Sequence, residues 1–237
     1  MKVERMIYSK KKKHFTLIDP ANGMISKEKI KFLKRFGTDA IIIGGSTDIK
    51  KKQLDKTILL IKKHSNLPTI LFPGGINGLS SHADALFFMS LLNSSDPYWI
   101  TGIQAQGASI VKKLGIKTIP MAYIIVEPGM KAGEVGKAIP IKRDNASLAA
   151  AYALAAQHMG FRLVYLEAGA GADKPVPTEM IHAVKENISI PLIAGGGIRT
   201  PGQAKAVARA GADIIVTGTI SEENFFALKE IIAAVKG

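Results

Sequence analysis

The sequence predicts an α/β protein of the (β/α)8 barrel class, in which parallel strands alternate with helices. Short runs rich in Ile, Val and Leu recur along the 237 residues, and helical patterns lie between most of them. Such continuous apolar runs are typical of parallel strands buried on both faces. Glycine-rich turns follow several of the runs. An open, doubly wound sheet is the alternative arrangement for the same alternation.

Eight apolar runs have the length of strands. They cover residues 14–19, 40–44, 69–72, 86–91, 118–126, 163–167, 191–195 and 213–218. No linker or strong internal repeat separates them, so residues 1–237 are expected to form one domain.

Helical patterns occupy most of the intervals between these runs. Residues 48–64 place Leu54, Ile58 and Ile61 on one helical face, at spacings of four and three. Asp144 is expected to cap the Ala-rich helix that follows it.

Thr200 and Pro201 have the residue types of an N-cap and a first helical turn. Residues 221–236 are expected to form the last helix.

The interval between the third and fourth runs, PGGINGLSSHADA, is rich in Gly and Ser and too short for a full crossover helix. We therefore expect a barrel with an altered or missing third helix.

The charge of the chain predicts anionic partners. The formal net charge is +13, and more than half of the Lys and Arg residues fall in the first 65 positions. Phosphates or an anionic membrane surface suit this charge. Nucleic acid is disfavoured, because the basic runs at residues 10–13 and 50–52 carry no interleaved aromatic residues or docking motif. A solvated protein face is the simplest interpretation of these runs.

Several classes of protein are excluded or disfavoured. The chain has no cysteine, which excludes disulfides, thiolate nucleophiles and Cys-based metal sites. The five histidines show no zinc-binding spacing, and no nucleophile elbow or Walker loop occurs. No apolar run reaches the ~20 residues that span a bilayer, and no signal segment is recognisable. A cytoplasmic location is expected. The single Trp, Trp99, is expected in the core, with an oligomer contact as the alternative.

Two glycine-rich turns predict a phosphate site. The seventh strand ends in Gly195, Gly196 and Gly197, and the eighth ends in Gly218 and Thr219. Turns without side chains expose backbone N–H groups, and the helix behind each turn adds a favourable dipole. The turns after strands seven and eight commonly bind phosphate in barrels of this class. The alternative is that these glycines only permit tight turns.

A third glycine-rich turn, residues 165–171, carries Tyr165 and Glu167 at the end of the sixth strand. A carboxylate at this position can accept a proton from a substrate hydroxyl or hydrogen-bond to polyol oxygens. A salt bridge to a lysine is the alternative role of Glu167.

Asp19 ends the first apolar strand, where an unpaired carboxylate is unfavourable. Mg2+ typically takes one or two protein oxygen ligands together with phosphate oxygens, and Asp19 with Ser46 fits this pattern. The alternatives are that Asp19 caps the turn before Pro20 and that Ser46 or Asp48 caps the next helix.

Six motifs occur together in order: HFTLIDP, GGS, LFPG, YLEAGAGA, GGGI and GT, which begin at residues 14, 44, 71, 165, 195 and 218. With these motifs the chain resembles the geranylgeranylglyceryl phosphate synthases, within the polyprenylglyceryl phosphate synthase family. The resemblance covers nearly the whole chain. It implies a (β/α)8 barrel with an altered third helix and a homo-oligomer.

The resemblance also implies an activity. This is the Mg2+-dependent transfer of a geranylgeranyl or other polyprenyl group from its diphosphate to the C3 hydroxyl of sn-glycerol 1-phosphate, an early step in ether-lipid synthesis. The metal ligands would be Asp19 and Ser46, and Glu167 would bind and deprotonate the acceptor. The acceptor site would comprise Tyr165, Leu166, Glu167, Ala168, Gly169, Ala170, Gly171, Gly196, Gly197, Gly218 and Thr219.

The chain departs from the family pattern at three places. Ala170 stands where many members have Ser, Leu17 where some have Lys, and Asn22-Gly23 where Asp-Lys is more usual. We expect Phe72 and Phe87 to line part of an apolar groove for the prenyl chain.

No single lysine of the basic N-terminal third can be chosen as the partner of the diphosphate. Two other functions suit the same motifs: a different phosphate-binding barrel enzyme, such as a sugar-phosphate isomerase, and a noncatalytic binder of phosphate ligands or nucleic acid.

Overall fold

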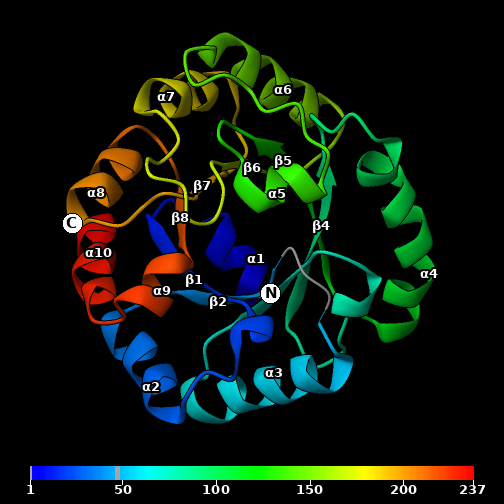
Figure 1. Ribbon diagram of the computed structural model, residues 1–237, viewed down its shortest axis with the longest axis vertical. Helices are drawn as coiled ribbons and strands as arrows, with labels where there is room; N and C mark the ends of the chain where they lie inside the picture. Colours follow the sequence, from blue (N-terminus) through cyan, green and yellow to red (C-terminus); the bar gives the residue numbers. More distant parts are fainter. Residues whose placement is uncertain (1, 46–48) are drawn as a thin grey trace.

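The protein is a closed barrel of eight parallel strands that follow one another in sequence order (Figure 1). The computed structural model describes residues 2–45 and 49–237. The strands are β1 (Lys13–Ile18), β2 (Ala40–Gly45), β3 (Thr69–Pro73), β4 (Ala85–Leu91), β5 (Thr118–Ile125), β6 (Leu163–Glu167), β7 (Leu192–Gly195) and β8 (Ile214–Thr217). The closure of the sheet by pairing of β1 with β8 confirms the barrel and excludes the open sheet.

Each strand lies within one residue of its expected bounds at either end. The apolar runs are continuous because alternate side chains meet two different cores. Phe15, Ile42 and Ile70 point into the barrel. Ile41 and Ile43 point outwards, against the helices. Both faces of the sheet are therefore removed from water, as expected for a parallel barrel.

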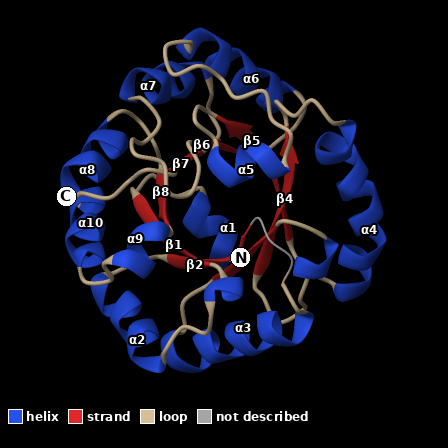
Figure 2. Ribbon diagram, in the orientation of Figure 1, coloured by secondary structure: helices blue, strands red, loops and turns tan. Residues whose placement is uncertain are grey.

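Helices surround the barrel as a ring (Figures 1 and 2). The longer ones are α2 (Lys27–Phe36), α3 (Lys51–Ser65), α4 (Ile103–Leu114), α6 (Ala146–His158), α7 (Thr178–Asn187), α8 (Pro201–Arg209) and α10 (Ala227–Lys236). The short helix α1 (Lys2–Ile7) packs Val3 and Ile7 against the inner core, where it covers the end at which the strands begin. None of the described helices is long and apolar enough to cross a membrane.

As expected, no full helix follows the third strand. Only a single 3-10 turn, η2 (Ile76–Gly78), lies between β3 and β4. The next connection holds a π-helical turn, η3 (Tyr98–Gly102), that leads into α4. The outer layer is therefore thin beside β3 and β4.

Two details of the helices differ from the expectations. Asn145, not Asp144, caps α6, because its side-chain oxygen accepts a hydrogen bond from the Leu148 N–H at 3.1 Å. The last helix is two helices, α9 (Thr219–Glu223) and α10, and residues 224–226 between them are not helical. The break allows Phe225 to pack among the aromatic rings of α2.

The expectations for α3 and α8 are confirmed. Leu54, Ile58 and Ile61 are all buried on the inner face of α3. At the start of α8 the Thr200 hydroxyl accepts a hydrogen bond from the Gln203 N–H at 3.2 Å. The Gln203 side chain accepts one in return from the Thr200 N–H at 3.1 Å. This reciprocal pair is a capping box, and it fixes the helix that follows the β7 turn.

We predict that Thr200→Ala lowers the free energy of unfolding by about 1 kcal/mol, because it removes the acceptor of one capping hydrogen bond. Urea denaturation of the purified protein measures this change. Thr200→Ser keeps the hydroxyl and serves as the control. A Thr200→Ser variant as unstable as Thr200→Ala would contradict the capping role.

Candidate active site

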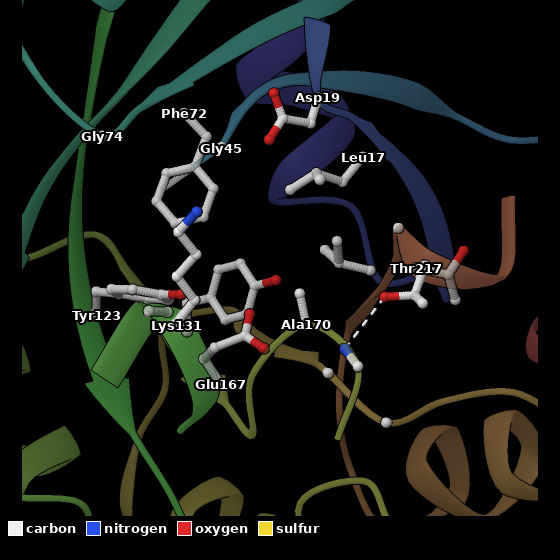
Figure 3. Close-up of a pocket in the computed structure, with 18 of the residues that line it drawn as sticks. Leu17, Asp19, Gly45, Phe72, Gly74, Tyr123, Lys131, Glu167, Ala170 and Thr217 are labelled. Atoms are coloured by element: carbon white, nitrogen blue, oxygen red, sulfur yellow. Dashed lines mark hydrogen bonds between the residues drawn. The ribbon is translucent and has the colours of Figure 1, made fainter. Parts of the chain in front are cut away.

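A single pocket at the carboxyl ends of the strands collects most of the residues singled out in the sequence (Figure 3). Its lining includes these predicted residues: Asp19, Tyr165, Glu167, Ala170, Gly171, Gly196, Gly197, Gly218 and Thr219. Parallel strands that close into a barrel bring all their carboxyl ends to one rim, which explains how residues so far apart in sequence meet.

Three of the residues predicted for the acceptor site lie outside this lining. Leu166 and Ala168 alternate with the pocket residues of β6 and its turn, and they pack in the outer core against the helices. Gly169 lies against the start of α5 (Met130–Val135), where a Cβ atom would come within 2.6 Å of the Met130 Cβ. Ser46, the second predicted metal ligand, lies outside the described residues.

The three glycine-rich turns contact one another. Gly196 and Gly197 have positive φ angles of 81° and 68°, which favour glycine. A Cβ atom on Gly196 would lie 2.5 Å from the Glu167 carboxylate, so the β7 turn needs a glycine to approach the β6 turn. The Gly171 N–H donates a hydrogen bond to the Thr219 hydroxyl at 3.2 Å, which joins the β6 turn to the β8 turn.

Glu167 is a buried carboxylate with neutral partners. Only 7% of the residue is exposed. It accepts a hydrogen bond from the Gly169 N–H at 2.7 Å and further hydrogen bonds from the phenols of Tyr165 and Tyr123. Burial raises the pKa of Glu167, and these hydrogen bonds offset part of the rise. No cation among the described residues pairs with it, so the alternative of a salt bridge to a lysine is not realised.

Asp19 lies across the cavity from Glu167 (Figure 3). Its Oδ1 accepts a hydrogen bond from the Ala21 N–H at 2.9 Å and caps the turn η1 (Pro20–Asn22), as one alternative expected. Its Oδ2 lies against Gly45. The Cβ atom of any larger residue at position 45 would overlap this oxygen. Burial raises the pKa of Asp19, the charge of Glu222 adds to the rise, and Lys131 opposes it.

The surroundings of Asp19 fit a divalent cation that takes few ligands from the protein. Oδ2 receives no hydrogen bond from any residue the structure describes. The described part of the chain holds no cluster of three or more His, Asp or Glu side chains that could enclose a metal ion. One carboxylate beside an open cavity is the arrangement that Mg2+ uses when substrate phosphates complete its shell.

Five polar residues of the pocket were missed by the sequence reasoning: Tyr123, Lys131, Arg199, Thr217 and Glu222. Glu222 accepts hydrogen bonds from the Asn22 amide at 3.0 and 3.2 Å, which join the β1 and β8 loops. Tyr123 sits in an ordinary apolar run, so no sequence signal marks it. For Glu222, the one signal in the sequence was indirect: its partner Asn22 is one of the residues that depart from the family pattern.

The basic N-terminal third contributes no cation to this pocket, because none of its described lysines is in the lining. Lys12 and Lys13 bond to backbone oxygens of Ala212 and Ser9 instead, at 2.8 and 2.7 Å. These contacts lie at the end of the barrel where the strands begin, away from the pocket. The pocket cations come from Lys131 and Arg199.

The expected apolar residues divide between two cavities. Phe72 lines the main pocket, whereas Phe87 lines a smaller apolar pocket under η2, in the thin part of the outer layer. Pro73 and Met89 border both pockets. Trp99, expected in the core, is partly exposed at the main pocket because the π-helical turn carries it to the rim.

These features are those of a class of enzymes, the (β/α)8 barrels with glycine-rich turns after their last strands, where barrels of this class commonly bind phosphate. The family follows from comparison with known proteins. The chain belongs to the PcrB family, whose model matches residues 6–236.

Several relatives of this chain are named geranylgeranylglyceryl phosphate synthase. The chain is 55% identical over 227 residues to the one from Pyrococcus horikoshii, covering 94% of this chain and 89% of that protein. The crystal structure of the Thermoplasma acidophilum (S)-3-O-geranylgeranylglyceryl phosphate synthase in complex with sn-glycerol-1-phosphate superposes with a TM-score of 0.93 at 44% identity, covering 99% of this chain and 96% of that one.

The synthase structure from Thermoplasma volcanium gives a TM-score of 0.90 at 48% identity and covers 99% of this chain and 95% of that one. The family resemblance, the barrel and the expectation of a prenyltransferase are thereby confirmed.

We predict that Tyr123→Phe raises the pKa of Glu167, because it removes a hydrogen bond that favours the ionised carboxylate. Carbon-13 NMR of protein labelled at glutamate side chains, titrated with pH, measures the change. Tyr152→Phe, on the outer helix α6, is the matched control and leaves the titration unchanged. A Tyr123→Phe variant whose Glu167 titrates at the wild-type pH or lower argues against this assignment.

Proposed function

We propose that the protein transfers a geranylgeranyl group from its diphosphate to the C3 hydroxyl of sn-glycerol 1-phosphate, for ether-lipid synthesis. The products are geranylgeranylglyceryl phosphate and diphosphate. One observation carries the proposal: a buried carboxylate lies between glycine-rich turns on one side of the pocket and an apolar wall on the other. The names of the relatives and the ligand of the Thermoplasma acidophilum structure support the choice of substrates.

The acceptor occupies the side of the pocket formed by the turns after β6, β7 and β8. Backbone N–H groups at Gly196, Gly197, Gly218 and Thr219 suit its phosphate. Its C3 hydroxyl then lies toward Glu167, the carboxylate with the raised pKa. A carboxylate of raised pKa is a stronger base toward a hydroxyl than an ordinary glutamate.

The donor chain occupies the apolar side. Phe72, Met89, Leu91, Trp99 and Val135 line this wall. Because the smaller pocket under η2 shares lining residues with the main one, the apolar surface extends toward the thin part of the outer layer. Each buried methylene group contributes about 0.8 kcal/mol to binding, so a wall of this kind favours long prenyl chains.

The reaction forms one carbon–oxygen bond and breaks another. The C3 oxygen of the acceptor bonds to the allylic carbon of the donor, the bond from that carbon to the diphosphate breaks, and the diphosphate leaves with the electron pair. Glu167 takes the hydroxyl proton. Asp19 would hold Mg2+, which when bound stabilises the negative charge of the leaving group.

Other features of the original expectation stay predictions. We expect a homo-oligomer and a cytoplasmic location. The net charge of +13 favours peripheral contact with an anionic membrane, where a lipid donor is found.

We predict that the wild-type protein converts geranylgeranyl diphosphate and sn-glycerol 1-phosphate to the ether product only with Mg2+, and that it prefers this enantiomer to the 3-phosphate. Glu167→Gln should lower kcat by about 10²- to 10⁴-fold, the usual contribution of a general base. The assay separates radiolabelled products by chromatography. Metal-independent turnover of a sugar phosphate without prenyl transfer would instead favour an isomerase.

The Glu167→Gln variant should fold. Because the folded-state pKa is raised, the stability contribution of Glu167 is largest at low pH and is lost as pH rises through that pKa. At neutral pH the Glu167→Gln variant, which carries a neutral amide, is therefore expected to unfold at the same denaturant concentration as the wild-type protein or at a higher one. A variant that folds and retains near-normal turnover removes Glu167 from the mechanism.

We predict that Ala170→Ser lowers the KM for sn-glycerol 1-phosphate by about fivefold, equivalent to about 1 kcal/mol for one added hydrogen bond. Ala170 lines the pocket beside the phosphate turns, so a hydroxyl here can reach the phosphate. Steady-state kinetics measure the change, and the KM for the prenyl diphosphate provides the internal control. An equal shift in both KM values would argue against a phosphate contact.

A further inference from the structure

Two cationic side chains line the main pocket, and they differ in their contacts. Arg199 forms an ion pair with Glu223, with 2.8 Å between Nη1 and Oε2. Lys131 makes no hydrogen bond or ion pair with any residue that the structure describes, although it faces the pocket. An ammonium group directed into a cavity without an anionic partner is available to an anionic ligand.

Lys131 belongs to α5, a short helix that lies over the barrel mouth, inside the ring of outer helices (Figure 1). The helix is fixed at both ends. At its start, the Gly129 N–H donates a hydrogen bond to the Ala168 oxygen at 3.0 Å, next to Glu167. At its end, Gly136 packs so closely on Leu91 of β4 that a larger residue would overlap it. The position of Lys131 is therefore set relative to the proposed general base.

The same helix also forms part of the apolar wall, because Ala132 and Val135 line the pocket beside Lys131. Lys131 and Asp19 line the same cavity (Figure 3). Lys131 thus lies where the apolar wall meets the acidic side of the cavity. A ligand with a hydrocarbon tail and an anionic head would place its head at this junction.

We propose that Lys131 binds the diphosphate of the prenyl donor and stabilises its negative charge as it leaves. The inference rests on the proposed function and names the cation that the sequence alone could not select. The side chain acts as a point charge with three N–H donors, which suits a diphosphate whose charge increases during bond cleavage. Figure 3 shows it directed from α5 into the cavity.

The test compares four proteins by titration calorimetry with inorganic diphosphate in the presence of Mg2+. Lys131→Met should weaken diphosphate binding by about tenfold, the usual effect of losing one charge-assisted contact. Lys131→Arg keeps the charge and should stay within about twofold of the wild-type protein. Lys142→Met is the matched control, since Lys142 follows α5 in the chain but lies outside the pocket lining.

Kinetics supply a second readout. Lys131→Met should lower kcat/KM for geranylgeranyl diphosphate by about tenfold or more and leave the KM for sn-glycerol 1-phosphate unchanged. Equal losses in Lys131→Met and Lys142→Met would overturn the inference, because a general loss of positive charge would then explain both. So would wild-type diphosphate affinity in Lys131→Met.

The inference and the proposed function can fail separately. A wild-type protein that transfers prenyl groups, with Lys131→Met equally active, refutes only the role of Lys131. A wild-type protein that transfers none refutes the proposed function, and a loss of diphosphate affinity in Lys131→Met would then still support Lys131 as an anion ligand.

Discussion

The contact between the turns after β6 and β7 is the constraint on which the site depends. Gly196 approaches the Glu167 carboxylate so closely that a single methyl group would lie 2.5 Å from it. This approach places the glycine-rich β7 turn beside the buried acid, and the Gly171–Thr219 hydrogen bond adds the β8 turn to the same cluster. The backbone of the glycine-rich turns and the Glu167 carboxylate thereby line one cavity.

The burial of Glu167 is unfavourable for folding, because a carboxylate loses its hydration there. Neutral donors offset part of this loss: one backbone N–H and two phenols. A lysine partner would have stabilised the ionised form more strongly and held the pKa low. The tyrosines therefore allow the acid to stay buried while its pKa remains raised, which is the condition that proton transfer from an alcohol requires.

The thin outer layer beside β3 and β4 has a consequence for the same pocket. A full helix after β3 would cover the surface where Pro73 and Met89 border both cavities. The 3-10 turn η2 leaves that side open to an apolar ligand, while the acidic and basic residues stay on the other sides. The barrel thus separates an apolar region from a polar, glycine-rich region within one cavity, and α5 carries Lys131 between them.

The order of strands, the gap after β3 and the glycine-rich turns could all be predicted from the sequence, because buried parallel strands and glycine turns leave local patterns. Glu167 and Asp19 were recognisable for the same reason, as acids at the ends of apolar runs. Local patterns could not identify Lys131 or Tyr123, and they pointed to the N-terminal lysines, which the structure places at the opposite end of the barrel or outside the pocket lining. Which cation faces a cavity depends on how the loops of distant strands pack together, and only the closed barrel brings those loops to one rim.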